Sequence, residues 1–280
     1  MSRPYLKMNG LGNDFVVVEA RSAPFCPKPE QIRSWADREC GLGPGRRGFD
    51  QLIAIEPSRT ADAFMRVWNA DAGEVETCGN ALRCVGRLLL EASGRDCVVI
   101  DTAAGATSAW RVSPDRIAVD MGAPRLLWSE IPLAEEMDTT GIELQVGPID
   151  APHLHTPGAV SMGNPHVVFF VPDAEAAPVR ETGSLIERHP LFPEGVNVGF
   201  AEPRGRGRIR LRVWERGAGL TRACGTGACA ALVAAVRRGL TERRAILELD
   251  GGELEIEWRL ADDHVVMAGP AELDGAGRLD

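Results

Sequence analysis

Two stretches of the sequence repeat one another and decide the fold: residues 66–84, RVWNADAGEVETCGNALRC, and residues 212–230, RVWERGAGLTRACGTGACA. Superposed at an offset of 146, they share seven identities in nineteen positions without a gap, including a tryptophan and a cysteine. An internal repeat indicates a chain built from copies of one structural unit. Coincidence between two common strand–loop–helix segments would not bring both rare residues into register.

Two weaker similarities precede this repeat in each half. GNDFVVV at 12–18 recurs as GNPHVVFF at 163–170, and GFD at 48–50 recurs as GVN at 195–197. All three similarities keep the same order in both halves. We therefore interpret the chain as two homologous halves that join near residues 120–128.

Hydrophobic periodicity indicates which elements each half contains. Residues 64–68 and 209–214 alternate apolar and polar side chains, as half-buried strands do. After each Cys-Gly the apolar spacing becomes helical, and Gly94 and Gly239 are the expected helix ends. Another helix is expected at 29–37, a hairpin turn at 250–252, and further strands at 97–101, 117–121, 167–171, 245–249, 254–258 and 265–267.

Strands thus outnumber helices and lack a regular βαβ order. This pattern predicts an α+β fold with two pseudo-symmetric lobes from an internal duplication, each a mostly antiparallel sheet or barrel around a central helix.

Composition and charge exclude several classes of protein. The 280 residues are 44% hydrophobic and 25% charged, which is typical of a globular protein rather than a disordered or fibrous one. Lys and Arg number 31 against 40 Asp and Glu, giving a net charge of −9. This charge argues against binding to nucleic acid or to an anionic membrane surface.

The seven cysteines and the first residues suggest where the protein works. No secretory signal is readable in residues 1–15, and no apolar run approaches the length of a membrane span. An odd number of cysteines in that context favours free thiols in a reducing compartment, so we expect a cytoplasmic protein. No cysteines have zinc-finger spacing, so we expect no metal.

Cys78 and Cys224 are the candidate chemical groups, because the repeat puts each of them at a strand–loop–helix junction. The first amides of a helix lack intrahelical partners and favour negative charge, which lowers the pKa of a thiol and can bind a carboxylate. Gly79 and Gly225 let the backbone approach a ligand closely, and Gly227 is a further glycine of this kind.

Two cysteines at duplicated positions suggest a pair of opposing acid–base groups. One thiolate would remove a proton from a tetrahedral carbon, and a thiol would deliver a proton to the opposite face, which inverts the carbon without a cofactor. A carbanion next to a carboxylate needs stabilisation by amides in a water-poor site.

Other interpretations of the cysteines remain open. A free cysteine is most often a small buried apolar residue, and we expect this of Cys84, Cys97 and Cys229. A Cys–His hydrolase with His166 as its base is an alternative, although it would not explain a second cysteine in an equivalent position.

The motifs MNGLGNDFVVVE, GFDQLIAIEPS, RVWNADAGEVETCGNALRC, SMGNPHVVFFV, EGVNVGF and ERGAGLTRACGTGACA run along nearly the whole chain. Together they resemble diaminopimelate epimerase, a cofactor-independent amino-acid epimerase of lysine and cell-wall biosynthesis. Proline racemases and phenazine-biosynthesis isomerases share the two-lobed fold. The segment GLGPGRRG at 41–48 is longer than the family's compact glycine loop.

The resemblance implies a substrate, diaminopimelate, and a set of site residues. It makes Cys78 and Cys224 the acid–base pair, with His166 as an assisting group. It makes the following residues substrate-binding: Asn13, Gln51, Asn69, Gly79, Asn80, Asn164, Asn197, Glu215, Arg216, Gly225 and Thr226. It also implies no cofactor and a homodimer.

We expect residues 1–124, completed by 269–280, to form the lobe with Cys78, and residues 125–268 the lobe with Cys224. Two other functions remain alternatives at this point. One is a non-catalytic binder of amino acids, which would not need both cysteines. The other is an epimerase of proline or hydroxyproline, which would not need the polar residues Asn69, Asn197 and Arg216 for a second amino-acid end.

Overall fold

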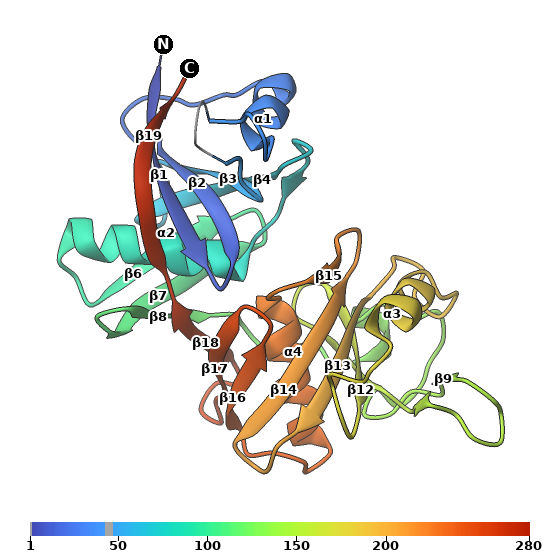
Figure 1. Ribbon diagram of the computed structural model, residues 1–280. Coiled ribbons are helices and arrows are strands. Elements are labelled where there is room, and N and C mark those ends of the chain that lie inside the picture. Colours follow the sequence, from blue (N-terminus) through green and yellow to red (C-terminus); the bar gives the residue numbers. More distant parts are fainter. Residues whose placement is uncertain (1, 43–46) are drawn as a thin grey trace. The chain divides into compact units, whose positions relative to one another are not determined.

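The computed structural model describes residues 2–42 and 47–280, and the chain divides into two compact units (Figure 1). The N-terminal unit runs to Asp120 and includes Ala268–Asp280, and the C-terminal unit is Met121–Met267. Four residues of the long loop at 41–48, residues 43–46, lie outside the described chain. The fold is α+β, with two homologous lobes dominated by strands, as the sequence predicted.

The described residues of the N-terminal unit form two helices and a mixed, mostly antiparallel set of strands. The helices are α1 (Pro29–Ala36) and α2 (Gly79–Ser93). The strands are β1 (Arg3–Gly10), β2 (Asn13–Glu19), β3 (Gln51–Glu56), β4 (Ala63–Asn69), β5 (Glu74–Val75), β6 (Cys97–Thr102), β7 (Gly105–Ser113), β8 (Arg116–Asp120) and β19 (Glu272–Leu279).

The C-terminal unit has the same kinds of element. Its helices are α3 (Val179–Glu187), α4 (Gly225–Arg237) and a short 3-10 turn, η1 (Trp128–Glu130). Its strands are β9 (Gln145–Val146), β10 (Leu154–His155), β11 (Gly158–Ser161), β12 (Pro165–Phe170), β13 (Asn197–Pro203), β14 (Arg208–Glu215), β15 (Gly219–Thr221), β16 (Arg244–Leu249) and β17 (Gly252–Trp258). Strand β18 (Val265–Pro270) runs from this unit into the N-terminal one.

Strand pairing shows that the two units share one topology. In the N-terminal unit β2 and β3 are parallel, β3–β4 and β4–β5 are antiparallel, and β6 returns parallel to β4 after α2. In the C-terminal unit β12–β13, β13–β14, β14–β15 and β14–β16 follow the same directions in the same order, with α4 in the place of α2. The duplication is therefore structural as well as sequential.

The register corrects one of the three sequence similarities by one residue. Leu52 is opposite Trp68 and Val198 is opposite Trp214, so Leu52 and Val198 are equivalent. Gln51 therefore corresponds to Asn197, and the alignment of Asp50 with Asn197 was wrong. The offset of 146 between the two main repeats gives the same equivalence, and the short match of GFD with GVN departed from that offset by one residue.

Each unit folds around one helix whose N-terminus follows a cysteine. Helix α2 contacts β1, β2 and β6–β8, and α4 contacts β11–β14, β16 and β17 (Figure 1). The predicted end of α2 is confirmed, because Gly94 has φ 66° and its amide bonds to Leu90 O over 3.0 Å.

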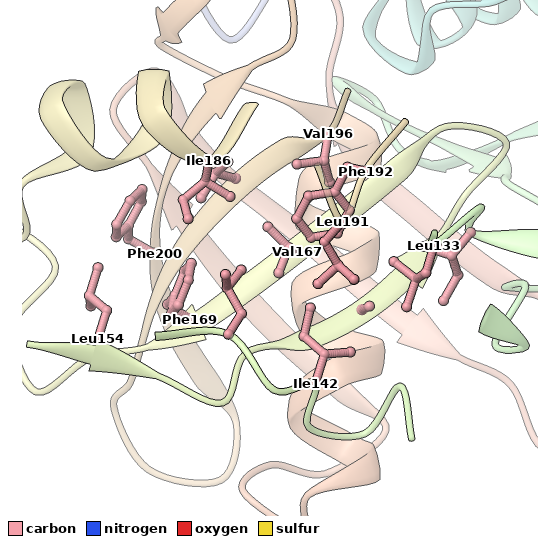
Figure 2. Packing of buried hydrophobic residues seen from close by; sticks show 14 of the residues in the cluster. Leu133, Ile142, Leu154, Val167, Phe169, Ile186, Leu191, Phe192, Val196 and Phe200 are labelled. Carbon is pink, nitrogen blue, oxygen red and sulfur yellow. The ribbon is translucent and has the colours of Figure 1, made fainter. Parts of the chain in front are cut away.

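Apolar packing positions α3 in the C-terminal unit. Phe169 and Phe200 stack with ring centroids 6.0 Å apart, and Ile186 of α3 and Val196 belong to the same buried cluster (Figure 2). Helix α3 was not predicted from the sequence. It is short, and its buried face includes Thr182, Gly183 and Glu187, so few large apolar side chains mark it in the sequence.

Most other predicted elements are confirmed within a few residues, including α1 and the β16–β17 hairpin, in which Leu249 is opposite Gly252. Cys84 and Cys229 are buried as expected. The prediction for Cys97 was wrong, because it is exposed at the first residue of β6, where the strand is only beginning. Among the described residues, every helix is too short or too polar to span a bilayer.

Candidate active site

Cys78 is the N-cap residue of α2. Its backbone is extended, with φ −145° and ψ 115°, and its side chain is partly exposed. Gly79 and Asn80 begin the helix and are buried. The thiol therefore lies beside the first amides of a helix, where an anion is stabilised by the unpaired N–H groups and by the helix dipole.

Cys224 takes the same place before α4, also with an extended backbone (φ −120°, ψ 108°). Its Sγ accepts a hydrogen bond from the Gly227 amide over 3.4 Å and lies 3.7 Å from the Thr226 hydroxyl. Unlike Cys78, it is buried, with only 4% of its surface exposed. Burial raises the pKa of Cys224 well above its usual range, and the negative charge of Glu215 raises it further.

Glu215 is the acidic neighbour of this thiol. It hydrogen-bonds to Cys224, and the Thr221 hydroxyl donates to its Oε1. Burial raises the pKa of Glu215 as well, so both groups of this pair favour their protonated forms. At rest the pair therefore keeps Cys224 as a thiol beside the N-terminus of α4.

A chain of hydrogen bonds connects the other polar residues expected near Cys224. Asn164 donates from Nδ2 to the Thr226 hydroxyl over 3.3 Å, and its Oδ1 lies 2.9 Å from His166 Nε2. Because an amide oxygen only accepts, Nε2 carries the proton. Burial and the charge of Arg216 lower the pKa of His166 to about 3, so the ring is neutral.

Asn197 orients the backbone that carries Arg216. Its Oδ1 accepts from the Arg216 amide over 2.9 Å, and its Nδ2 donates to Pro165 O over 3.0 Å. The Arg216 side chain is exposed, and its Nη1 donates to Glu194 O over 2.5 Å. Arg216 is thus fixed at its backbone while its guanidinium has room to bind an anion.

Amide side chains also gather in the N-terminal unit. Gln51 donates from Nε2 to Asn69 Oδ1 over 2.9 Å, across the β3–β4 ladder. Within the described residues, Gln51 Oε1 and Asn80 Oδ1 are buried without a hydrogen-bond partner. Buried acceptors of this kind normally have a donor, which a ligand can supply.

Asn13 is held by an acidic neighbour. Its Nδ2 donates to Asp50 Oδ2 over 2.9 Å, and the same oxygen accepts from the Asp14 amide over 3.0 Å. A carboxylate can only accept, so the amide nitrogen of Asn13 must face Asp50. Its carbonyl oxygen is then left to accept a bond from elsewhere.

Two cations hold this acidic pair in place. Arg38 bonds to both Asp14 oxygens over 2.8 Å and also contacts Asp50, while Lys7 Nζ lies 2.8 Å from Asp14. Burial raises the pKa of Asp14, but the hydrogen bonds from Arg38 and Lys7 outweigh it and hold this pKa well below its usual range. Asp14 therefore stays ionised.

Hydrogen bonds join many of the predicted site residues into small groups within each unit. Gln51 pairs with Asn69, and Asn13 is held by Asp50. In the C-terminal unit one group comprises Asn164, His166, Glu215, Cys224 and Thr226, and Asn197 with Arg216 forms another; the buried Gly225 is the first residue of α4. Sequence reasoning missed Thr221 and Asp50. Thr221 lies three residues before Cys224, which is a signal that a search for hydroxyls near the thiol could have used.

A family model described as diaminopimelate epimerase matches residues 5–127 and 158–273. The chain belongs to the diaminopimelate epimerase family. Its relatives include the diaminopimelate epimerases of Phenylobacterium zucineum, 61% identical, and of Caulobacter sp. strain K31, 60% identical; each alignment covers 100% of this chain and 98% of the relative. That of Rhodopseudomonas palustris strain BisB18 is 46% identical, with 100% and 95% covered.

Solved structures show that the diaminopimelate epimerase fold is shared more widely. A hydroxyproline epimerase from Agrobacterium vitis superposes with a TM-score of 0.69 at 18% identity, covering 99% of this chain and 90% of that one. A phenazine biosynthesis protein from Bacillus anthracis gives a TM-score of 0.67 at 14% identity, covering 100% and 99%. At such identities the likeness concerns the fold alone.

Proposed function

We propose that this chain is an isomerase that interconverts LL-2,6-diaminopimelate and meso-diaminopimelate, in the biosynthesis of lysine and of peptidoglycan precursors. One observation carries the mechanism: in each half of a duplicated fold, a cysteine directly precedes the N-terminus of the central helix. Membership of the family supports the substrate. The proposal includes no cofactor and no metal.

The chemical step uses Cys78 and Cys224 as a base and an acid. One cysteine, as a thiolate, takes the Cα proton and becomes a thiol. The electron pair stays on Cα and its carboxylate, and the other thiol then gives its proton to the opposite face of Cα. Atoms and charge balance, since one thiolate and one thiol are present before and after. The reverse reaction needs only the opposite protonation states.

The helix N-termini supply the stabilisation that this step needs. Gly79 and Asn80 in the first turn of α2, and Gly225 and Thr226 in the first turn of α4, carry amides without intrahelical partners. Such amides donate to a carboxylate that gains charge as the carbanion forms. Burial and the charge of Glu215 keep Cys224 protonated at rest, which suits this thiol to act first as the acid.

The amide and guanidinium groups bind the remaining polar ends of the substrate. A substrate with two amino-acid ends needs donors for its carboxylates and acceptors for its ammonium groups. The unpartnered oxygen of Gln51 and the outward oxygen of Asn13 are acceptors, and Arg216 is a donor. Asn69 and Asn164 complete this set, with Asn197 holding Arg216. The neutral His166 assists through Asn164 rather than by carrying a proton.

Further parts of the proposal concern the assembly. We assign residues 1–124 with 269–280 to the lobe of Cys78 and residues 125–268 to the lobe of Cys224. We also propose a homodimer in the cytoplasm. Size-exclusion chromatography with light scattering measures the oligomeric state directly.

The experiment that tests the function follows LL-diaminopimelate by NMR in deuterated buffer without added cofactor. The meso isomer should form, with solvent deuterium at Cα. Turnover without deuterium at Cα would contradict proton transfer, and activity removed by a chelator and restored by a metal would contradict a cofactor-free reaction. Proline and hydroxyproline as substrates test the alternative specificity, and we expect no exchange with either.

A further inference from the structure

Glu187, the last residue of α3, is a buried carboxylate in the C-terminal unit, with 9% of its surface exposed. Its Oε2 accepts from the Trp214 indole N–H over 2.7 Å, and its Oε1 accepts from the Gly217 amide over 3.0 Å. Within the described chain, both of these donors are neutral. A buried carboxylate is costly unless its oxygens are satisfied, so a residue with this charge needs a reason beyond filling space.

The two donors lie on either side of Glu215 and Arg216 in the sequence. Residues 215–218 form a turn, closed by the bond from the Ala218 amide to Glu215 O over 3.1 Å. Gly217 has φ 78° in this turn, a conformation that favours glycine. The carboxylate of Glu187 therefore holds the turn at both of its ends.

The backbone of Glu187 extends this support to a third segment. Its carbonyl oxygen accepts from the Val196 amide over 3.0 Å. The next residue, Asn197, accepts from the Arg216 amide over 2.9 Å. One residue of α3 thus connects the segments that carry Asn197, Glu215 and Arg216.

Helix α3 is itself fixed in place. A Cβ added at Gly183 would lie 2.5 Å from Trp214 Cβ, so the helix approaches this tryptophan as closely as a glycine allows. Ile186, next to Glu187, packs in the buried cluster with Val196 (Figure 2). Because α3 is held by this packing, the Glu187 carboxylate has a fixed position from which to hold the turn at residues 215–218.

The N-terminal unit, built on the same topology, allows a comparison with the contacts of Glu187. Asp37 is the residue that follows α1, and its carboxylate accepts from the amides of Glu39 and Cys40, both over 2.8 Å. The equivalent turn there carries Asn69 and Ala70 in place of Glu215 and Arg216. A buried glutamate that holds the turn is thus found in the unit whose turn carries Glu215 and Arg216.

We propose that Glu187 is a positioning residue that holds Glu215 against Cys224 and Arg216 towards the substrate. The role rests on the proposed function for its effect on turnover. Its effect on the Cys224 thiol does not depend on turnover, so the two can be tested separately.

The test replaces Glu187 by glutamine, which keeps the size but turns one oxygen into an N–H donor facing another donor. The turn then shifts, and Glu215 moves away from Cys224. We expect Cys224 to be alkylated by iodoacetamide at least about threefold faster, with Cys78 unchanged, as measured by peptide mass spectrometry. The KM for diaminopimelate should rise about tenfold, because Arg216 is displaced.

Glu181→Gln, an exposed change on the same helix, is the matched control and should keep the parent values. A lower melting temperature with parental alkylation of Cys224 and parental KM would overturn the proposal, because that is the result of a purely structural role. If Glu187→Gln does not fold, Trp214→Phe decides: it removes one of the two donors, and unchanged alkylation of Cys224 would equally reject the proposal. The alkylation result holds even if the chain proves inactive towards diaminopimelate.

Discussion

The amide of Gly227 donates to Cys224 Sγ, and the sulfur occupies the space into which a side chain at Gly227 would extend. A Cβ built there would lie 3.2 Å from Cys224 Sγ and also 3.2 Å from Val213 Cγ2. The glycine therefore allows the first turn of α4 to close around the thiol.

Gly227→Ala should reduce activity with little change in stability. Crowding costs about 1–2 kcal/mol, but alanine in a helix regains close to 1 kcal/mol relative to glycine. We expect kcat to fall about tenfold or more, as the sulfur is pushed from its position. Steady-state kinetics and thermal unfolding measure both effects. Gly207→Ala is the control, since nothing lies within 4 Å of its added Cβ, and parental kcat in Gly227→Ala would contradict the prediction.

Replacing Cys78 or Cys224, which precede the helices, should lower kcat far more than replacing Cys84 or Cys229, which lie inside them. Cys78→Ser and Cys224→Ser should each lower kcat at least about a hundredfold, because a hydroxyl is a far poorer base than a thiolate. Substrate should still bind, since the helix amides and Arg216 remain. Isothermal titration and kinetics on purified variants separate binding from turnover.

Cys84→Ala and Cys229→Ala are the counterparts, and both thiols are buried. Burial raises the pKa of Cys84 to about 12, so it has no thiolate to offer at neutral pH. Each change should cost about 1–2 kcal/mol of stability and leave kcat close to the parent value. Near-parental turnover by Cys224→Ser would instead point to a single-thiol reaction centred on Cys78.

His166 should stay neutral over the whole working pH range. Burial and the charge of Arg216 lower its pKa to about 3, so the ring gains a proton only in strong acid. An NMR titration of the imidazole resonances from pH 8 to 5 should show no protonation of His166. A midpoint near the usual value of about 6.5 would show that the ring is accessible to water and able to carry protons.

The ion pairs of Asp14 should make stability depend on pH in a defined direction. The folded pKa lies below the unfolded value of about 3.9, so the stabilisation is complete well above that pH and is lost as pH falls towards the folded pKa. At pH 7, Asp14→Asn should lower the free energy of unfolding by about 1–2 kcal/mol. The difference should shrink at pH 3.

Urea denaturation at both pH values measures this effect. Asp96→Asn, an exposed carboxylate, serves as the control. A loss for Asp14→Asn that is the same at pH 7 and pH 3 would show that the ion pairs contribute nothing and that only packing was disturbed.

The sequence predicted what local patterns determine and missed what the strand register determines. The helix ends at Gly94 and Gly239 and the helix starts after Cys78 and Cys224 follow from periodicity and glycine chemistry. The equivalence of Gln51 with Asn197 depends on which residues pair across β3–β4 and β13–β14. The offset of 146 in the main repeat already gives this equivalence, but the short match of GFD with GVN departed from that offset by one residue and misplaced it.

The contacts of Glu187 could not be predicted from the sequence either, because they depend on tertiary packing. In the sequence it is one glutamate among many, at the end of a short helix whose buried face carries few large apolar side chains. Only the packing of α3 against Trp214 brings its carboxylate to the turn of Glu215 and Arg216, which lies almost thirty residues further on. Exposed Cys97 shows the converse, because apolar neighbours in β6 suggested burial that the first residue of the strand does not have.

Strand β1 pairs with β19 along most of its length, with Arg3 opposite Leu279, so the two ends of the described chain lie side by side (Figure 1). During synthesis the ribosome releases β19 long after β1. The C-terminal unit is continuous in sequence and can finish folding while its neighbour still lacks a strand. The surroundings of Cys78 are therefore completed after those of Cys224, although Cys78 is synthesised before Cys224. A nascent chain stalled before β19 would contain a complete C-terminal unit and an incomplete N-terminal unit.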